Sequence, residues 1–270
     1  WSATFQWDKA IISYFFPLTQ LTYYLIPAFL LRRFGVLANT VMTTAFPLMS
    51  ELAGLGEQEA LKGAYRQCSQ LALWMIVPGF ALLFILAPQF LTLWLGAGFS
   101  IQVVLPLRLL LTAHFFHELG TMPMTASYGL GRPNSALALQ TLQAALSVGS
   151  WFVLIPRLGI TGAALGLLAA QALTAPFYAL WVSRSLFSMG PLEYLKGILL
   201  RPLAAGAVFI LFLWPLRDHA WAWTPLLALA AASTLLYYAA GFLLLDGEDR
   251  RSLRRLGTAF LSRVREGGAQ

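Results

Sequence analysis

Two adjacent arginines, Arg32 and Arg33, interrupt a long apolar segment near the start of the chain. A guanidinium group presents a planar fork of N–H donors that matches the oxygen spacing of phosphates and carboxylates. Successive residues of a helix point about 100° apart, so the two side chains cannot both face one cavity squarely. We expect one of them to bind an anionic substrate, while the other pairs with a carboxylate or extends to an interface. The alternative is a purely structural pair.

A second set of ionisable residues, His114, His117 and Glu118, lies in another apolar segment. His114 and Glu118 are four residues apart and therefore share one face of a helix. Ionisable groups inside apolar segments are costly and usually serve a function. We hypothesise a titratable site that couples substrate movement to a proton or a sodium ion. In the alternative interpretation, Glu118 neutralises one of the arginines in the apolar segments, or it stays protonated.

Other signatures of chemistry are absent from the sequence. It contains no glycine-rich phosphate loop, no CxxC and no HExxH. His219 falls in a predicted loop, apart from the other two histidines, so the three do not form a zinc site. Arg108 lies near the end of its apolar segment, where its long side chain is expected to extend to the interface. The sequence therefore predicts no enzyme, no cofactor and no metal.

The composition indicates that membrane-spanning helices position these candidates. Hydrophobic residues make up 59% of the chain and charged residues 11%, whereas a soluble domain carries about 25% charged residues. Polar surface is too scarce to cover a water-soluble globule, and the single cysteine, Cys68, excludes a disulfide scaffold. We predict an all-α fold, a polytopic membrane bundle of about seven transmembrane helices.

The spans follow from the uncharged segments, because a helix needs about 20 mostly apolar residues to cross the bilayer core. In the first span, Pro27 and Pro47 are expected to kink one long helix. The alternative ends a span at Leu31 and uses Arg32 and Arg33 as a loop. The predicted bundle occupies 19–245, with spans at 19–50, 67–88, 103–128, 134–156, 159–183, 198–216 and 221–245.

The distribution of basic residues favours seven spans over eight. With seven spans, twelve of the 18 lysines and arginines fall on one side, three on the other and three within spans. Cytoplasmic connections are rich in lysine and arginine, so the first side is predicted to be cytoplasmic. This arrangement explains the net charge of +7 without nucleic-acid binding. The twelve residues are Lys62, Arg66, Arg132, Arg184, Lys196, Arg201, Arg250, Arg251, Arg254, Arg255, Arg263 and Arg265.

The two ends of the chain are predicted to lie on opposite sides of the membrane. The chain begins with Trp1 rather than Met, so we expect a fragment in which 1–18 is a truncated connection on the outer side. The tail, 246–270, alternates apolar residues and arginines at helical spacing. It is predicted to be a cytoplasmic basic amphipathic helix on the anionic leaflet. The alternative is a partly disordered basic tail.

Several short motifs, in this order along the chain, resemble landmarks of the polysaccharide-export flippases. They cover most of the chain up to about residue 185. A GLGRP turn at 129–133 is followed one helix later by LIPRLGITGAA at 154–164, which opens the next span. Further matches are DKAII at 8–12, YY at 23–24, FPLMS at 46–50 and DR at 249–250. One departure is Ser150-Trp151, where relatives often carry asparagine.

The resemblance implies membership of the multidrug/oligosaccharidyl-lipid/polysaccharide exporter superfamily, whose members contain two pseudo-equivalent bundles around a central cavity. This chain would be the C-terminal half. Such proteins move an undecaprenyl-pyrophosphate-linked oligosaccharide across the bacterial inner (plasma) membrane, for surface polysaccharides such as O-antigen. A basic residue at the position of Arg32 or Arg33 would line the cavity. Membrane lipids and other polysaccharide-assembly proteins are the implied partners.

Other functions remain open at this stage. A drug or cation exporter of the same superfamily would favour an acidic, aromatic cavity, whereas here the central cations outnumber Glu118. A lipid II flippase also has a cationic cavity. An integral-membrane glycan polymerase, ligase or glycosyltransferase typically uses a sizeable outer loop, and the predicted outer loops near 89–102, 157–158 and 217–220 are small. A structural scaffold leaves the central arginines unexplained.

Overall fold

The computed structural model describes residues 11–14, 18–219 and 221–244, and its regular structure in these ranges is entirely helical. The prediction of an all-α fold is therefore confirmed. Most of the predicted connection 1–18 and the whole predicted tail 246–270 lie outside the described residues. The elements are α2 (Leu18–Leu55), α3 (Gln58–Leu95), α4 (Ala97–Gly129), α5 (Pro133–Phe187), α6 (Pro191–Tyr194), the π-helical turn η1 (Leu195–Leu199), α7 (Leu200–Leu216), the 3-10 turn η2 (Arg217–His219) and α8 (Trp223–Leu244).

Five helical segments are long and apolar enough to cross a membrane, by length and composition. They confirm the prediction of a multi-pass membrane bundle. The five segments are Gln58–Leu95, Ala97–Gly129, Pro133–Phe187, Pro191–Leu216 and Trp223–Leu243. α2 is a further long helix of 38 residues, and it runs without a break through Arg32 and Arg33.

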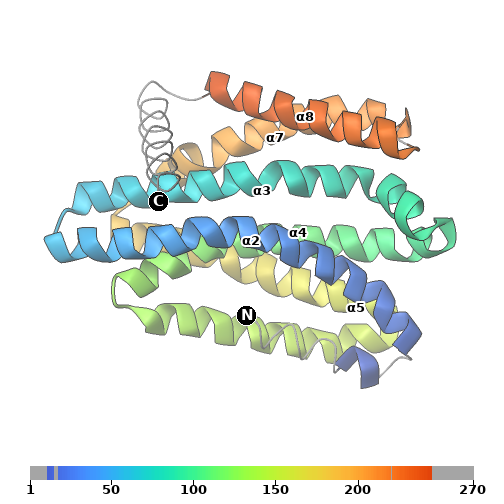
Figure 1. Cartoon of the computed structure of the whole chain (residues 1–270). Coiled ribbons are helices and arrows are strands. Elements are labelled where there is room, and N and C mark those ends of the chain that lie inside the picture. Colours follow the sequence, from blue (N-terminus) through green and yellow to red (C-terminus); the bar gives the residue numbers. More distant parts are fainter. Residues whose placement is uncertain (1–10, 15–17, 220, 245–270) are drawn as a thin grey trace, which may run out of the picture.

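α5 is a helical hairpin rather than one straight helix. Its 55 residues would extend about 80 Å at 1.5 Å per residue, far beyond the bilayer core of about 30 Å. The chain reverses at Gly159, whose φ of 63° and ψ of −138° are accessible mainly to glycine. The two arms, 133–158 and 160–187, run in opposite directions (Figure 1).

Small residues let the two arms of α5 pack backbone to backbone. A Cβ added at Gly162 would collide with the carbonyl group of Leu154, and one added at Gly166 would lie 2.8 Å from Cδ1 of Trp151. The indole Nε1 of Trp151 donates to the carbonyl oxygen of Ala163 at 3.0 Å. The LGITGAA motif is thus the inner edge of the hairpin, and Trp151 pins one arm to the other.

The connections collect at two ends of the bundle (Figure 1). The turns between α2 and α3, α4 and α5, and α5 and α6 meet at one end, which we call the basic end. The turns between α3 and α4 and between α7 and α8, together with the reversal of the chain within α5, lie at the opposite end. Six of the lysines and arginines lie in or beside the turns of the basic end: Lys62, Arg66, Arg132, Arg184, Lys196 and Arg201.

Candidate functional site

Arg32 and Arg33 lie on the part of α2 that faces away from the bundle. Their side chains are exposed, whereas Ala28 and Leu31 on the neighbouring face are buried. The guanidinium carbon of Arg33 lies 4.9 Å from the centre of the Phe29 ring, a cation–π contact. No ion pair between described residues joins either arginine to an acidic side chain. The pair therefore presents its charge to whatever covers this face of α2.

The second candidate set is on the buried face of α4. His114 is 2% exposed, and its Nδ1 lies 3.1 Å from the carbonyl oxygen of Leu110. The ring centres of His114 and His117 are 6.5 Å apart, and the ring planes are inclined at 62°. Glu118 is 9% exposed, and its Oε2 has no hydrogen-bond partner among the described residues. The three residues thus form one polar patch inside the protein.

The two candidate sets lie at about the same depth on parallel helices. Oγ1 of Thr125 and Sδ of Met42 are 3.4 Å apart, and Ser50 Oγ donates to the carbonyl oxygen of Gly129 at 3.1 Å. α2 and α4 therefore run side by side in the same direction. Ten residues before the Met42–Thr125 contact, α2 reaches Arg32 while α4 is between His114 and His117. The arginines and the polar patch therefore lie at similar positions along the two helices, but the arginines face outward and the polar patch faces the interior.

The polar patch of α4 is completed by the two arms of α5. A Cβ on Gly120 would lie 3.3 Å from Cβ of Ala175 and 3.9 Å from Cδ2 of Leu139, so α4 packs against both arms. The side chain of Gln171 lies beside His117, and the hydroxyl of Thr121 donates to the carbonyl oxygen of His117 at 3.1 Å. Besides Gln171, the buried polar residues of the arms include Gln143, Ser147 and Thr174.

Three oxygen atoms in this α4–α5 interior lack hydrogen-bond partners within the described part of the chain. They are Oε2 of Glu118, Oγ of Ser147 and Oε1 of Gln171. Leaving a buried polar atom unpaired costs about 1–3 kcal/mol, so such atoms usually mark a bound water or ion. Carboxylate, amide and hydroxyl oxygens are the donors that hard cations prefer. Within 11–14, 18–219 and 221–244, no three His, Cys, Asp or Glu residues gather as a metal site.

The sequence singles out Glu118 as a candidate but not its neighbours on α5. Gln143 and Ser147 are four residues apart, and Gln171 and Thr174 are three apart, so each pair lies on one helix face. This spacing of polar residues in apolar segments was the available signal. The residues carry no charge, however, and only the reversal at Gly159 shows that both pairs belong to one hairpin packed on α4.

Arg108 is partly exposed and also bonds to the backbone of α3. Its Nε donates to the carbonyl oxygen of Phe84 at 2.9 Å. That oxygen is available because the residue four positions later, Pro88, has no N–H to complete the α-helical bond. The guanidinium group of Arg108 therefore satisfies a backbone group that a proline leaves open.

Comparison with known proteins supports the fold and leaves the family unassigned. No protein-family model matches the chain, and no curated protein sequence matches it. Among solved structures, the chain is similar to the lipid II flippase MurJ in an inward closed conformation, with a TM-score of 0.64 and 13% sequence identity. The match covers 86% of this chain and 49% of the MurJ chain, so the chain spans about half the length of that protein. The described helices therefore have the fold of about half of a MurJ-like membrane protein.

Proposed function

We propose that this chain is the C-terminal half of a flippase that moves a polyprenyl-pyrophosphate-linked oligosaccharide across the bacterial inner membrane. One observation carries the proposal. Arg32 and Arg33 are exposed on α2, within a bundle whose fold is similar to that of a flippase. A lipid-linked pyrophosphate is an anion that crosses the bilayer only if its charge is compensated inside the protein.

The cost of burying arginine in a membrane supports this role. An arginine at the centre of a membrane helix costs about 2.5–3.5 kcal/mol on insertion scales, and such residues usually face a wet cavity. On α2 the bundle side is already filled by residues such as Leu31 and Ala28. The arginines point the other way, where the second half of a two-bundle flippase would close a central cavity. The guanidinium fork suits the oxygens of pyrophosphate.

The basic end of the bundle supports an orientation in the membrane. Of the basic residues at the helix turns, six lie at the basic end, and Arg157 and Arg217 lie at the opposite end. We place the basic end in the cytoplasm, because cytoplasmic connections are rich in Lys and Arg. The oligosaccharide would then enter at the basic end and leave at the end that contains Gly159.

The polar interior between α4 and α5 is our proposed coupling site. His114, His117 and Glu118 lie inside the bundle at the depth of the arginines, and Glu118 and Gln171 offer unpaired oxygens. Binding of a proton or a sodium ion there would change the charge between α4 and the α5 hairpin. A shift of α4 against its parallel neighbour α2 would carry this change to the arginines.

The test uses the full-length protein in a strain that lacks its own flippase. Arg32→Ala and Arg33→Ala, singly and together, are compared at matched expression with Arg157→Ala, an exposed arginine at the hairpin turn. We expect the double variant to lose surface polysaccharide and to accumulate the lipid-linked glycan in the inner leaflet, while Arg157→Ala exports normally. Normal export by the double variant would remove the arginines from the mechanism.

A lipid II flippase is the second candidate, and the similarity to MurJ favours it. Both candidates carry a polyprenyl pyrophosphate, so the arginines would act alike in both. A complementation experiment in cells distinguishes the two functions. A lipid II flippase restores growth after depletion of the resident one, whereas a polysaccharide flippase restores only the surface glycan.

A further inference from the structure

Two arginines, one on α4 and one in the turn η2, are held against the C-terminal part of α3, at the end of the bundle opposite the basic end. Arg108 on α4 lies over the ring of Phe84 on α3, with its guanidinium carbon 5.4 Å from the ring centre. Arg217 follows α7 and stacks on Trp214 at 3.9 Å. Arg108 is bonded to the carbonyl oxygen of Phe84, and Gln89, five residues further along α3, is bonded to Arg217. Neither residue belongs to the proposed substrate or coupling sites.

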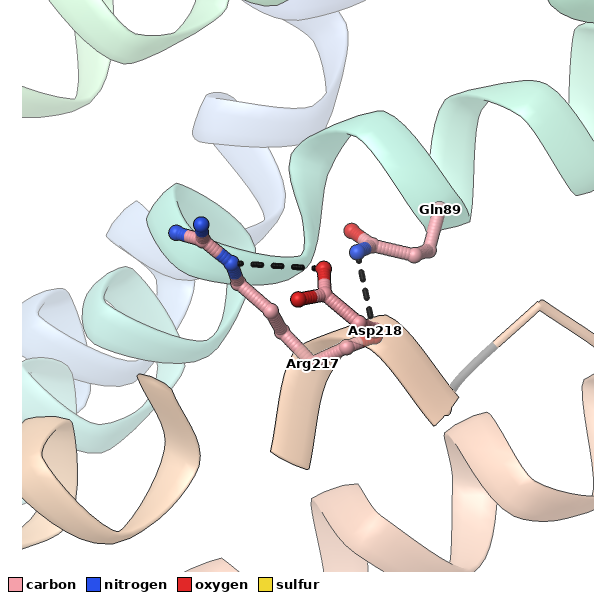
Figure 2. Close-up of polar contacts among 3 residues, drawn as sticks. All are labelled: Gln89, Arg217 and Asp218. Carbon is pink, nitrogen blue, oxygen red and sulfur yellow. Dashed lines mark hydrogen bonds and ion pairs between the residues drawn. The ribbon is translucent and has the colours of Figure 1, made fainter. Parts of the chain in front are cut away.

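Arg217 is held in place by a bond from α3. Nε2 of Gln89 donates to the carbonyl oxygen of Arg217 at 3.1 Å, which fixes the connection between α7 and α8 against α3 (Figure 2). The same figure shows Nε of Arg217 beside Asp218, 3.5 Å from Oδ1. Asp218 is 72% exposed, so solvent weakens this ion pair. The backbone contact with Gln89, rather than the ion pair, therefore sets the position of Arg217.

Both arginines keep their terminal nitrogens for another partner. In the described part of the chain, the hydrogen bond of Arg108 and the ion pair of Arg217 each use Nε. The two Nη groups of each guanidinium remain as donors. With one exposed carboxylate against two guanidinium groups, this corner of the molecule keeps a positive charge. The positive charge and the remaining N–H donors of this corner favour the binding of an anion.

An apolar groove of about 280 Å³ is lined in part by two residues that contact Arg108. Phe84 and Thr112 line it, and both touch Arg108: Phe84 through its ring and carbonyl group, Thr112 through a 2.9 Å bond from its hydroxyl to the Arg108 carbonyl oxygen. Leu203 and Ile210 on α7 line the groove and are 37% and 41% exposed, so it opens sideways toward lipid. Its other lining residues come from α3, α4 and α7: Val77, Phe80, Ala81, Leu111, Phe115, Gly206 and Ala207.

We propose that this corner binds an anionic glycerophospholipid of the membrane, with its phosphate between Arg108 and Arg217 and an acyl chain in the groove. The charges favour an anionic lipid, because one anionic head group complements the two arginines and its acyl chain fits the apolar groove. A zwitterionic lipid also carries a positive group in its head, so its electrostatic attraction to the two arginines is weaker. The lipid ties α7 to α3 and α4 where Gln89 already holds the α7–α8 connection.

Thermal unfolding of the purified full-length protein in detergent tests the head-group half of the proposal. Phosphatidylglycerol is expected to raise the unfolding midpoint and to bind at least tenfold more tightly than phosphatidylcholine. Arg217→Gln should weaken phosphatidylglycerol binding about tenfold, the scale of one charge-assisted hydrogen bond. Because Arg217 is in a connection, this variant keeps the Arg108–Phe84 bond. Arg157→Gln, which removes an exposed arginine at the same end, should bind like the parent protein.

Filling the groove tests the acyl-chain half. Ala207→Phe places a ring in the groove from an exposed position, and Val208→Phe places the same ring on α7 outside it. We expect only Ala207→Phe to weaken phosphatidylglycerol binding. Equal binding of the two lipids, or unchanged phosphatidylglycerol binding in both Arg217→Gln and Ala207→Phe, would overturn the proposal. Equal stabilisation by inorganic phosphate would also overturn it, since the groove would then play no part.

Discussion

Gln70 on α3 is bonded to Gly197 in η1, the π-helical turn that leads into α7. The side-chain amide of Gln70 donates to the carbonyl oxygen of Gly197. Leu195–Leu199 is a turn of π-helix, in which the N–H of Leu200 reaches back five residues. In that register Gly197 needs the N–H of residue 202, which is a proline. Gln70 therefore replaces a backbone donor that the sequence cannot supply.

We expect Gln70→Leu to destabilise the protein by about 1–3 kcal/mol, because it leaves the Gly197 carbonyl buried and unpaired. Gln67→Leu is the matched control, since Gln67 is exposed on the same helix. The measurement is the unfolding midpoint of each variant in the same detergent. Equal midpoints for the two variants would mean that water or another group satisfies Gly197.

The hairpin of α5 gives a second prediction. Gly162→Ala is expected to cost about 1–3 kcal/mol, because the added Cβ meets the backbone of Leu154 and the arms must separate. Gly149→Ala, also in α5, should cause no loss, since nothing lies within 4 Å of its added Cβ. Thermal unfolding of both variants decides the matter. A stable Gly162→Ala protein would show that the arms do not need this contact.

The coupling site gives a third prediction. With the full-length protein in proteoliposomes, Glu118→Gln should abolish the dependence of transport on a proton or sodium gradient, because it removes the acidic side chain that the described residues place in the polar interior. Glu51→Gln, which changes an exposed residue at the end of α2, should leave that dependence intact. Ionophores that collapse each gradient in turn identify the ion. Persistent gradient dependence in Glu118→Gln would place coupling elsewhere.

The sequence predicts the class of fold well, because composition and uncharged length depend on the chain alone. The all-α membrane bundle required no knowledge of packing. The helices nevertheless extend beyond the apolar segments: α3 begins at Gln58, before the uncharged segment that follows Arg66. Backbone hydrogen bonds continue where the apolar run ends, so charge patterns locate the membrane segment rather than the end of a helix.

The candidate site is less predictable from the sequence. Arg32 and Glu118 stand out as charges among apolar residues, and both were found. Their orientation was not predictable: the arginine faces outward and the carboxyl group is buried, and only the packing of α2 on α4 decides this. Ser147 and Gln171 could not be predicted, because neutral residues do not stand out in an apolar segment. Only the fold of the α5 hairpin shows that both lie in the same interior.

The close packing of the α5 arms beside the turn at Gly159 also bears on how the helices can move. The backbone contact at Gly162 and the indole bond from Trp151 oppose sliding of the two arms against each other. We therefore expect the segment from Pro133 to Phe187 to move as one unit against α4, which it contacts at Gly120. Such a movement would change the distances around Glu118.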